Sequence, residues 1–216
     1  MRELLIVGGG GFGRETAQMV AGLPEWRLAG FLEDDSTRVG ELVDGVPVLG
    51  DPAENIARRP GAAVVVCTGN TRDYGSRERI VNRLGLPADR YATLVHPTAW
   101  VSRNSTLGPG TVLLAGVVLT ASVTVGAHVS VMPHVTLTHD DVVHDYTTIA
   151  SGARLSGNVR VGPGAYVGAG ALVREGRTVG AGALVGMGAV VLHDVPPREV
   201  WIGSPAHRLR TQGDPS

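Results

Sequence analysis

The hydrophobic pattern changes once along the chain, from separate blocks of apolar residues to a strict repeat of six. From residue 95 to residue 191, an aliphatic side chain occurs at every sixth position without exception. These positions are Val95, Val101, Leu107, Leu113, Leu119, Val125, Val131, Leu137, Val143, Ile149, Leu155, Val161, Val167, Val173, Val179, Val185 and Val191. A period of six fits neither an amphipathic helix nor a simple strand alternation. It indicates a repeat architecture of short extended segments joined by corners.

The position four residues after each aliphatic residue is also restricted. It is small or β-branched in all but two of the hexapeptides, and the exceptions are Asp141 and Arg177. Turn-forming residues gather at the corners, as in Gly108-Pro109-Gly110. Three hexapeptides would close one triangular coil, and stacked coils would pair their strands in parallel about 4.8 Å apart. The sequence therefore predicts an all-β parallel β-helix over residues 93–196.

The residues before the repeat alternate between strand-like and helix-like segments. The predicted strands are 3–7, 27–32 and 63–67, with a short extended piece at 46–49, and the predicted helices are 14–23, 52–59 and 76–84. Strands that alternate with helices are typical of a doubly wound parallel sheet. We therefore expect an α/β Rossmann-like half domain over residues 1–92 and assign residues 197–216 to a C-terminal tail.

A glycine-rich loop follows the first predicted strand. Gly8, Gly10 and Gly13 match the spacing G-x-G-x-x-G, and Glu33 or Asp34 lies about twenty residues further on. Such glycines let the backbone approach a phosphate closely, and the acid can bind ribose hydroxyls. Only one mononucleotide-binding half precedes the repeat, which favours a nucleotide or nucleotide sugar over NAD. The alternative is that the glycines serve only a tight turn between strand and helix.

Composition and charge exclude several classes of function. The chain is 43% apolar and 18% charged, with a net charge of −1, which is ordinary for a globular protein. Its basic residues are scattered arginines, which argues against a nucleic-acid surface or a polybasic membrane patch. Cys67 ends an apolar run and is interpreted as a small buried side chain rather than a nucleophile. The first residues lack a signal peptide, so we expect a cytoplasmic protein without membrane association.

Several motifs spread over residues 3–210 occur in the order found in one known family. They are Ile6–Gly13, Gly30–Asp35, Thr68-Gly69-Asn70, Val95–Ala99, His139-Asp140, Leu155–Val159 and Ile202–Ala206. In these motifs the chain resembles the hexapeptide-repeat sugar O- and N-acetyltransferases, such as sialic-acid O-acetyltransferases and UDP-4-amino-sugar or GDP-perosamine N-acetyltransferases. The resemblance implies a left-handed β-helix, a homotrimer, acetyl-CoA as cosubstrate and a nucleotide-linked sugar as acceptor.

His139 and Asp140 are the candidate catalytic residues. A base must take a proton from the acceptor amine or hydroxyl as it attacks the acyl thioester, and a free imidazole titrates near neutral pH. In the family that this chain resembles, the matching histidine is that base and the adjoining acid orients it. Asp141 breaks the small corner position beside them, and residues that break a structural rule cluster at functional sites. The alternative is a polar surface corner without catalytic function.

The resemblance also implies binding residues for both substrates. Acyl-CoA would lie in the groove between adjacent prisms of the trimer and contact Gly157 and Ala169, with the Gly157 N–H as candidate oxyanion donor. Family members often carry a second histidine near the acetyl group, where this chain has Thr148. The nucleotide of the acceptor would contact Gly10, Gly11, Phe12, Glu33, Asp34, Gly69 and Asn70. Some amino-sugar enzymes have histidine at the position of Phe12, which leaves the acceptor open.

Two other functions remain open at this stage. His134, His139 and His144 are five residues apart, and hexapeptide-repeat proteins that resemble γ-carbonic anhydrases bind zinc with histidines from two subunits. Against zinc, those proteins lack an N-terminal nucleotide-type domain, and these histidines take different places in successive hexapeptides, so we expect no metal. A catalytically idle scaffold or regulatory protein is the second alternative. The sequence leaves open the sugar, N- or O-acylation, and the size of the acyl group.

Overall fold

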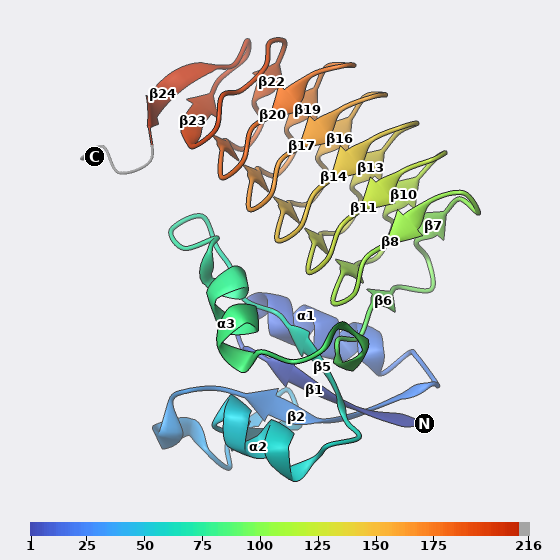
Figure 1. The fold of residues 1–216 in the computed structure, drawn as a ribbon, viewed down its shortest axis with the longest axis vertical. Helices are drawn as coiled ribbons and strands as arrows, with labels where there is room; N and C mark the ends of the chain where they lie inside the picture. Colours follow the sequence, from blue (N-terminus) through green and yellow to red (C-terminus); the bar gives the residue numbers. More distant parts are fainter. Residues whose placement is uncertain (212–216) are drawn as a thin grey trace.

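The chain folds into an α/β part followed by a triangular β-helix, which we call the prism (Figure 1). A computed structural model describes residues 1–211, and the last five residues of the predicted tail lie outside the described part. None of the helices in residues 1–211 has the length and apolar character needed to cross a lipid bilayer.

The α/β part contains one five-stranded sheet with the strand order β3-β4-β2-β1-β5. Its strands are β1 (Arg2–Val7), β2 (Trp26–Leu32), β3 (Leu42–Val43), β4 (Val46–Gly50) and β5 (Ala63–Val66). Its helices are α1 (Gly11–Val20), α2 (Pro52–Arg58) and α3 (Ser76–Leu84), with short 3₁₀ turns η1 (Ser36–Arg38) and η2 (Ala88–Arg90). All neighbouring strands are parallel except β3, which forms a hairpin with β4. The predicted strands and helices of this part are therefore present, whereas β3 was not predicted.

The central strand β1 is buried on both faces of the sheet. Leu4 and Ile6 belong to a core shared with α1, while Leu5 and Val7 pack with residues of α2 and α3 on the other side. This arrangement explains why β1 is a continuous apolar run rather than an alternating one. Prism residues also join the core on the α1 side, so the sheet and the prism enclose α1 between them (Figure 1).

The prism has three parallel sheets, one on each face, and the chain visits the faces in turn. Face 1 contains β6 (Leu94–Val95), β9 (Val112–Leu113), β12 (Ser130–Val131), β15 (Thr148–Ile149), β18 (Tyr166–Val167) and β21 (Leu184–Val185). Face 2 contains β7 (Trp100–Val101), β10 (Val118–Leu119), β13 (Thr136–Leu137), β16 (Arg154–Leu155), β19 (Leu172–Val173) and β22 (Val190–Val191). Face 3 contains β8 (Thr106–Leu107), β11 (Thr124–Val125), β14 (Val142–Val143), β17 (Arg160–Val161) and β20 (Thr178–Val179).

Each coil stacks on the next with a shift of eighteen residues, as in the pairing of Val118 with Thr136 and of Leu119 with Leu137. This register confirms the predicted parallel β-helix. It also stacks the aliphatic residue of every hexapeptide on its equivalent in the next coil, and from Leu113 onward these residues are almost completely buried. The core is thus a continuous column that no single coil could form alone.

The end of the prism differs from the predicted tail. The described part of that tail forms β23 (Glu199–Ile202), which pairs in parallel with β21, and β24 (His207–Thr211), which pairs with β23 in antiparallel fashion. The sequence did not predict these strands because the hexapeptide pattern ends at Val191. Ala206 and Trp201 nevertheless pack against the same apolar column.

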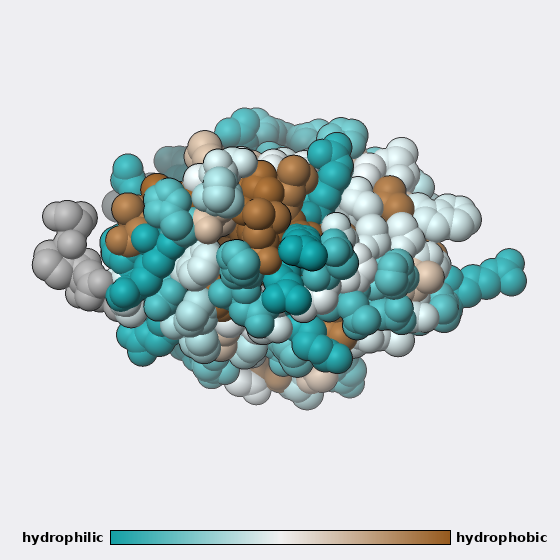
Figure 2. All heavy atoms as spheres, turned by 90° about the horizontal axis from the view of Figure 1, so that it is seen from above, coloured by the Kyte–Doolittle hydropathy of each residue, from teal (hydrophilic) through white to brown (hydrophobic). Residues whose placement is uncertain are grey.

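Some apolar side chains of the prism remain exposed. Figure 2 shows apolar atoms gathered in a patch between polar ones on the surface seen from above. Among the large apolar residues, Trp100 and Leu172 of face 2 are 66% and 41% exposed. Leu172 in β19 and Trp100 in β7 are separated by three strands of the sheet, so they are exposed singly.

Candidate active site

His139 and Asp140 lie in the corner between β13 and β14. We call the edge on which this corner lies the outer edge; it joins faces 2 and 3 and consists of the corners 102–105, 120–123, 138–141, 156–159 and 174–177. His139 Nδ1 is 2.9 Å from Asp140 Oδ2, and both side chains are more than half exposed. Because Asp140 occupies Nδ1, the Nε2 atom of His139 is the nitrogen available to a substrate.

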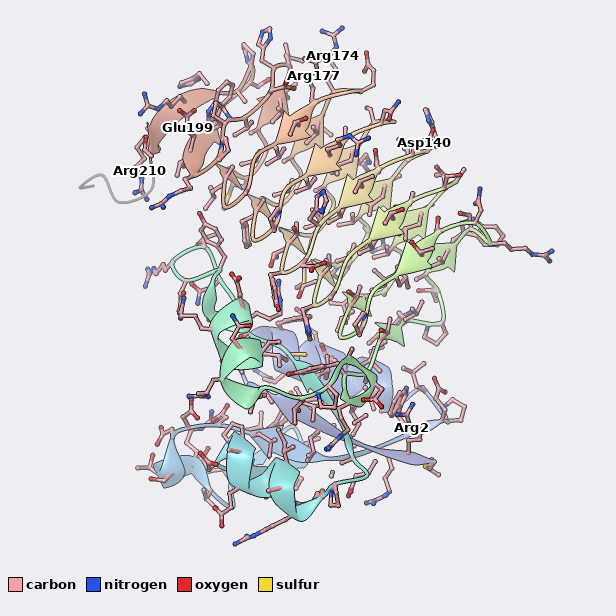
Figure 3. The ribbon with its side chains drawn as sticks, viewed as in Figure 1. Arg2, Asp140, Arg174, Arg177, Glu199 and Arg210 are labelled. Carbon is pink, nitrogen blue, oxygen red and sulfur yellow. The ribbon has the colours of Figure 1, made fainter. Side chains whose placement is uncertain are left out.

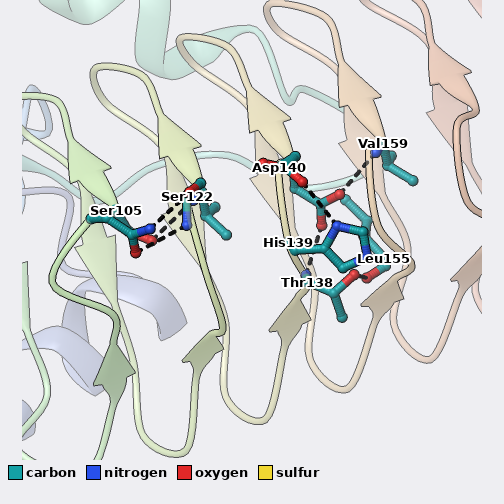
Figure 4. Close-up of polar contacts among 10 residues, drawn as sticks. Ser105, Ser122, Thr138, His139, Asp140, Leu155 and Val159 are labelled. Atoms are coloured by element: carbon teal, nitrogen blue, oxygen red, sulfur yellow. Dashed lines mark hydrogen bonds and ion pairs between the residues drawn. The ribbon is translucent and has the colours of Figure 1, made fainter.

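Hydrogen bonds hold this corner between its two neighbouring coils (Figure 4). The Asp140 N–H donates to Ala121 O of the previous coil at 3.0 Å. The carbonyl of His139 accepts from the Asn158 N–H at 2.9 Å, and the Thr138 hydroxyl donates to Leu155 O at 3.0 Å. Asp140 itself has a left-handed backbone with φ of 64°. The histidine therefore sits on a well-fixed turn although its side chain is exposed.

Asp141, the break in the repeat, is completely buried at the same corner. Its Oδ2 accepts from the Thr138 N–H and its Oδ1 from the Val159 N–H, each at 2.8 Å. Burial raises the pKa of Asp141 to about 7, although these two hydrogen bonds favour the charged form. The Asp141 side chain thus points into the prism, away from solvent, and its hydrogen bonds to two backbone N–H groups hold the corner that carries His139.

Gly157 lies one coil further along the outer edge, directly against the imidazole. A Cβ at this position would lie less than 3.0 Å from Cε1 and Nε2 of His139, so only glycine leaves room for the ring. Within residues 1–211, the Gly157 N–H has no hydrogen-bond partner, whereas its carbonyl accepts from the Gly176 N–H. The structure therefore brings His139, Asp140 and Gly157 together.

The other two predicted acyl-donor residues lie elsewhere. Ala169 is in the corner between β18 and β19, on the edge joining faces 1 and 2. Thr148 begins β15 on face 1 and is buried, and its hydroxyl accepts a 2.9 Å hydrogen bond from Arg77 of α3. A single chain does not bring either residue to His139.

Arg77 is a buried cation that sequence reasoning missed. It is 1% exposed and also donates to the carbonyls of Thr68, Tyr146 and Thr147 at 2.9–3.1 Å. Its Nε has no hydrogen-bond partner among the described residues, and burial lowers its pKa to about 10. These bonds fasten α3 and the Thr68 loop to the prism.

A pocket of about 510 Å³ lies between the glycine loop and face 1. The lining residues are Gly8, Gly9, Gly10, Gly11, Phe12, Glu33, Cys67, Thr68, Gly69, Asn70, Thr71, Met132 and Tyr166. Six of the seven residues predicted to contact the nucleotide are therefore together. Met132 and Tyr166 were not predicted, because they belong to the prism and only the docking of the two parts brings them to the glycine loop.

Asp34 is the one predicted nucleotide contact that does not line this pocket. Its carboxylate pairs with Arg83 of α3, at 2.9 Å. Glu33 does line the pocket, but its Oε1 accepts from the Gly9 N–H at 2.8 Å and its Oε2 pairs with Arg38 at 2.5 Å. Glu33 thus supports the glycine loop in addition to facing the pocket.

The glycines of the loop have different roles. Gly8 has φ of 101°, and a Cβ on Gly13 would collide with the carbonyl oxygen of Gly8, so these two serve the tight turn. Gly10 and Gly11 face open space, with no atom within 4 Å of a Cβ at either position. Gly10 caps α1 without a side-chain hydrogen bond, and no acid lies in the first turn. The start of α1 therefore presents free N–H groups to the pocket, as an anion requires.

The pocket and the candidate base lie on opposite sides of the prism. Met132 follows β12 and Tyr166 lies in β18, both on face 1, whereas His139 is on the outer edge opposite that face. Figure 3 shows Asp140 at the margin of the prism furthest from the α/β part. One chain therefore holds two half-sites that do not meet.

The histidines considered for zinc do not converge either. His134, His139 and His144 occupy the three different corners of one coil. Corners recur every six residues, so a spacing of five residues moves each histidine to the next corner. Within the described residues no group of three histidine, cysteine or acidic side chains could hold a metal ion. Cys67 is buried, and burial raises the pKa of its thiol to about 12, so it is no nucleophile at neutral pH.

Comparisons with known proteins find relatives of both parts of the chain. Residues 3–84 match the model of the PglD N-terminal domain. The chain is 34% identical over 118 residues to UDP-N-acetylbacillosamine N-acetyltransferase of Bacillus subtilis (strain 168), which covers 53% of this chain and 52% of that protein. The match thus spans about half the length of this curated relative.

Solved structures match over nearly the whole length. The acetyltransferase domain of PglB from Neisseria gonorrhoeae FA1090, in complex with acetyl coenzyme A, is 31% identical with a TM-score of 0.84, over 96% of this chain and 99% of that one. A histidine-to-alanine variant of GDP-perosamine N-acetyl transferase from Caulobacter crescentus, in complex with CoA and GDP-perosamine, is 30% identical with a TM-score of 0.86, over 96% and 97% of the two chains.

Proposed function

This chain belongs to the hexapeptide-repeat sugar acetyltransferases, and from that premise we propose that it transfers an acetyl group from acetyl-CoA to a nucleotide-linked sugar. The acceptor atom is an amine or a hydroxyl. The amine is favoured because the similar proteins named for their substrates are N-acetyltransferases. Because the proposed acyl donor is acetyl-CoA, we place the reaction in the cytoplasm.

The observation that carries this proposal is the pairing of His139 with Asp140 on an exposed edge, with Gly157 against the ring. The acceptor amine attacks the thioester carbonyl, a C–N bond forms, and its proton passes to His139 Nε2. Asp140 stabilises the resulting imidazolium, and the Gly157 N–H faces the developing oxyanion. The C–S bond then breaks, and the thiolate of coenzyme A takes the proton from His139. No covalent intermediate with the protein is needed.

The pocket at the glycine loop is proposed to bind the nucleotide. Gly10 and Gly11 allow a phosphate to approach the backbone, and the free N–H groups of α1 attract its charge. Glu33 is the only charged side chain in the pocket lining, so no basic side chain there contacts the phosphates. The buried Arg77 donates to the carbonyl of Thr68, a lining residue, and so places a positive charge next to the pocket wall.

We further propose that a homotrimer assembles the complete site. The nucleotide pocket lies on face 1 and His139 on the opposite edge, so the base must come from a second copy. Gly157 and Ala169 likewise lie on different edges, which suits acyl-CoA bound in a groove between two prisms.

The proposal is tested with purified protein, acetyl-CoA and a panel of UDP-, GDP-, dTDP- and CMP-linked amino sugars, with released thiol as the readout. We expect turnover with at least one acceptor and at least a hundredfold loss in His139→Ala, with the oligomeric state unchanged. Full activity of that variant would exclude His139 as the base. Absence of acetyl-CoA binding by calorimetry would instead support a catalytically idle scaffold.

A further inference from the structure

The inward-facing position of the outer edge alternates between polar and aliphatic residues over its first coils. In successive coils it holds Ser105, Val123, Asp141 and Val159. Ser105 Oγ accepts from the Val123 N–H at 3.0 Å. Asp141 Oδ1 accepts from the Val159 N–H at 2.8 Å in the same way (Figure 4). Both polar residues therefore bind one corner to the backbone of the next coil.

A hydroxyl would be sufficient for that bond. Thr111 on another edge also accepts from the N–H eighteen residues ahead, that of Val129, at 3.1 Å. The carboxylate of Asp141 does one thing more, because its second oxygen accepts from the Thr138 N–H and closes the turn that carries His139 and Asp140. At the Ser105 corner, the turn is closed by a contact between the hydroxyls of Ser102 and Ser105.

The carboxylate is costly at this position. Asp141 is fully buried, and the corners above and below it, 156–159 and 120–123, carry no titratable side chain. The charged groups that face it are therefore His139 and Asp140 of its own turn. Burial raises the pKa of Asp141 to about 7; the N–H groups of Val159 and Thr138 and then the nearby His139 lower it, and Asp140 raises it. The corner that carries the candidate base thus has a buried acid at the position where another corner of the same edge has the hydroxyl of Ser105.

We infer that Asp141 is a positioning residue for His139, whose carboxylate fixes the His139 turn to the coil that carries Gly157. The inference rests on the proposed acetyl transfer only in assigning His139 as the base. Val159 follows Gly157 by two residues, so one carboxylate connects the two sides of the site. Loss of the Thr138 bond would free the turn and let the imidazole move from its place against Gly157.

The test compares Asp141→Thr and Asp141→Asn with the matched control Ser105→Ala, which removes the equivalent bond from a corner without a histidine. Threonine fits this inward position elsewhere in the prism and keeps an acceptor for the Val159 N–H, but it cannot also bind the Thr138 N–H. Two quantities are measured on the full-length protein. One is kcat and KM with acetyl-CoA and an accepted sugar nucleotide, and the other is the NMR spectrum of the isotope-labelled His139 ring without substrates.

We expect Asp141→Thr to lower kcat about tenfold or more, with KM for acetyl-CoA within about twofold, since small displacements of a catalytic group reduce kcat. The His139 ring signals should shift in both Asp141 variants and remain unchanged in Ser105→Ala. If Asp141→Thr fails to fold, Asp141→Asn provides the same two readouts.

Wild-type His139 signals and kcat in a folded Asp141 variant would overturn the inference. Equal losses of kcat in Asp141→Thr and Ser105→Ala would also overturn it, because the effect would then belong to coil stacking in general. If no sugar nucleotide is acetylated, the proposed function fails, while the His139 signals still decide whether Asp141 positions the ring.

Discussion

The imidazole of His139 lies against the α-carbon of Gly157, one coil away on the outer edge, at a distance that leaves no space for a side chain. This contact fixes which side of the ring faces the prism and leaves the other side for the substrates. Because Gly157 has no left-handed backbone conformation, its glycine identity is explained by the ring and not by the turn.

The first prediction is therefore that Gly157→Ala displaces His139. We expect kcat to fall about a hundredfold, because the added methyl group occupies the position of the ring, while thermal stability changes little. Gly61→Ala is a suitable control, since no atom lies within 4 Å of its Cβ and its backbone is not left-handed. Equal kcat values for both variants would show that the ring tolerates the methyl group.

The second prediction concerns the charge of Asp140. Asparagine tolerates the left-handed backbone at this position and can still accept from the imidazole, so Asp140→Asn removes the charge without disturbing the turn. We expect kcat to fall about ten- to a hundredfold, because the imidazolium loses its counter-charge. Steady-state kinetics measures this, and circular dichroism checks the fold. An unchanged kcat would reduce Asp140 to a turn-forming residue.

The third prediction separates the glycines of the loop. Gly13→Ala would place a methyl group on the Gly8 carbonyl, so we expect the α/β part to lose several kcal/mol of stability. Gly11→Ala meets open space and should leave the melting temperature unchanged, but it should raise KM for the sugar nucleotide about tenfold if the phosphates approach this backbone. If Gly11→Ala binds normally, the phosphates lie elsewhere in the pocket.

The fourth prediction concerns the pH dependence of stability. His128 is buried at the junction of the two parts, with the Tyr91 ring perpendicular to its own and Tyr146 stacked on its face. Burial and then the nearby charge of Arg77 lower its pKa from 6.5 to about 4, while Asp145 acts in the opposite direction. A lowered histidine pKa contributes stability above pH 6.5, and this contribution is lost as the pH falls towards 4.

Between pH 6.5 and pH 4, the free energy of unfolding should fall by on the order of 3 kcal/mol because of His128. Urea unfolding at fixed protein concentration between pH 4 and 8 measures it. His128→Asn suits the left-handed backbone and should be less stable at every pH, because the ring contacts are lost, but its stability should fall less steeply on acidification. If the free energy of unfolding of the wild type and of His128→Asn falls equally steeply with decreasing pH, His128 does not cause the pH dependence.

The hexapeptide repeat predicted the coil of the prism. One coil was predicted to have eighteen residues, and in the structure His139 and Gly157, which are eighteen residues apart, lie on the same edge. The sequence could not predict how face 1 docks on the α/β part. Met132 and Tyr166 look like ordinary outward positions of the repeat, and Arg77 looks like one more charged residue of a helix until the prism covers it.

The break at Asp141 was interpreted from sequence as a mark of the active site, and its neighbours do carry the candidate base. Its orientation was not predictable, because an acid in an aliphatic column would be expected to turn outward. Two backbone N–H groups that otherwise lack acceptors make the inward position possible. Likewise, β23 and β24 depend on pairing with the last coil and not on a period of their own.

The eighteen-residue register also determines the height of each residue along the axis of the prism. Met132, which borders the pocket, follows β12 in the coil that carries His139, and Tyr166 lies in β18, two coils further along, so the pocket spans the height of the candidate base. Rotation about an axis parallel to the prism changes the direction in which a residue faces but not its height. In the proposed homotrimer, the His139 of one copy would therefore stand level with the pocket of another. Insertion of one whole coil of eighteen residues between Met132 and His139 would keep the register of the repeat, but it would raise the base, together with Tyr166, by about 4.8 Å relative to Met132 and the glycine loop.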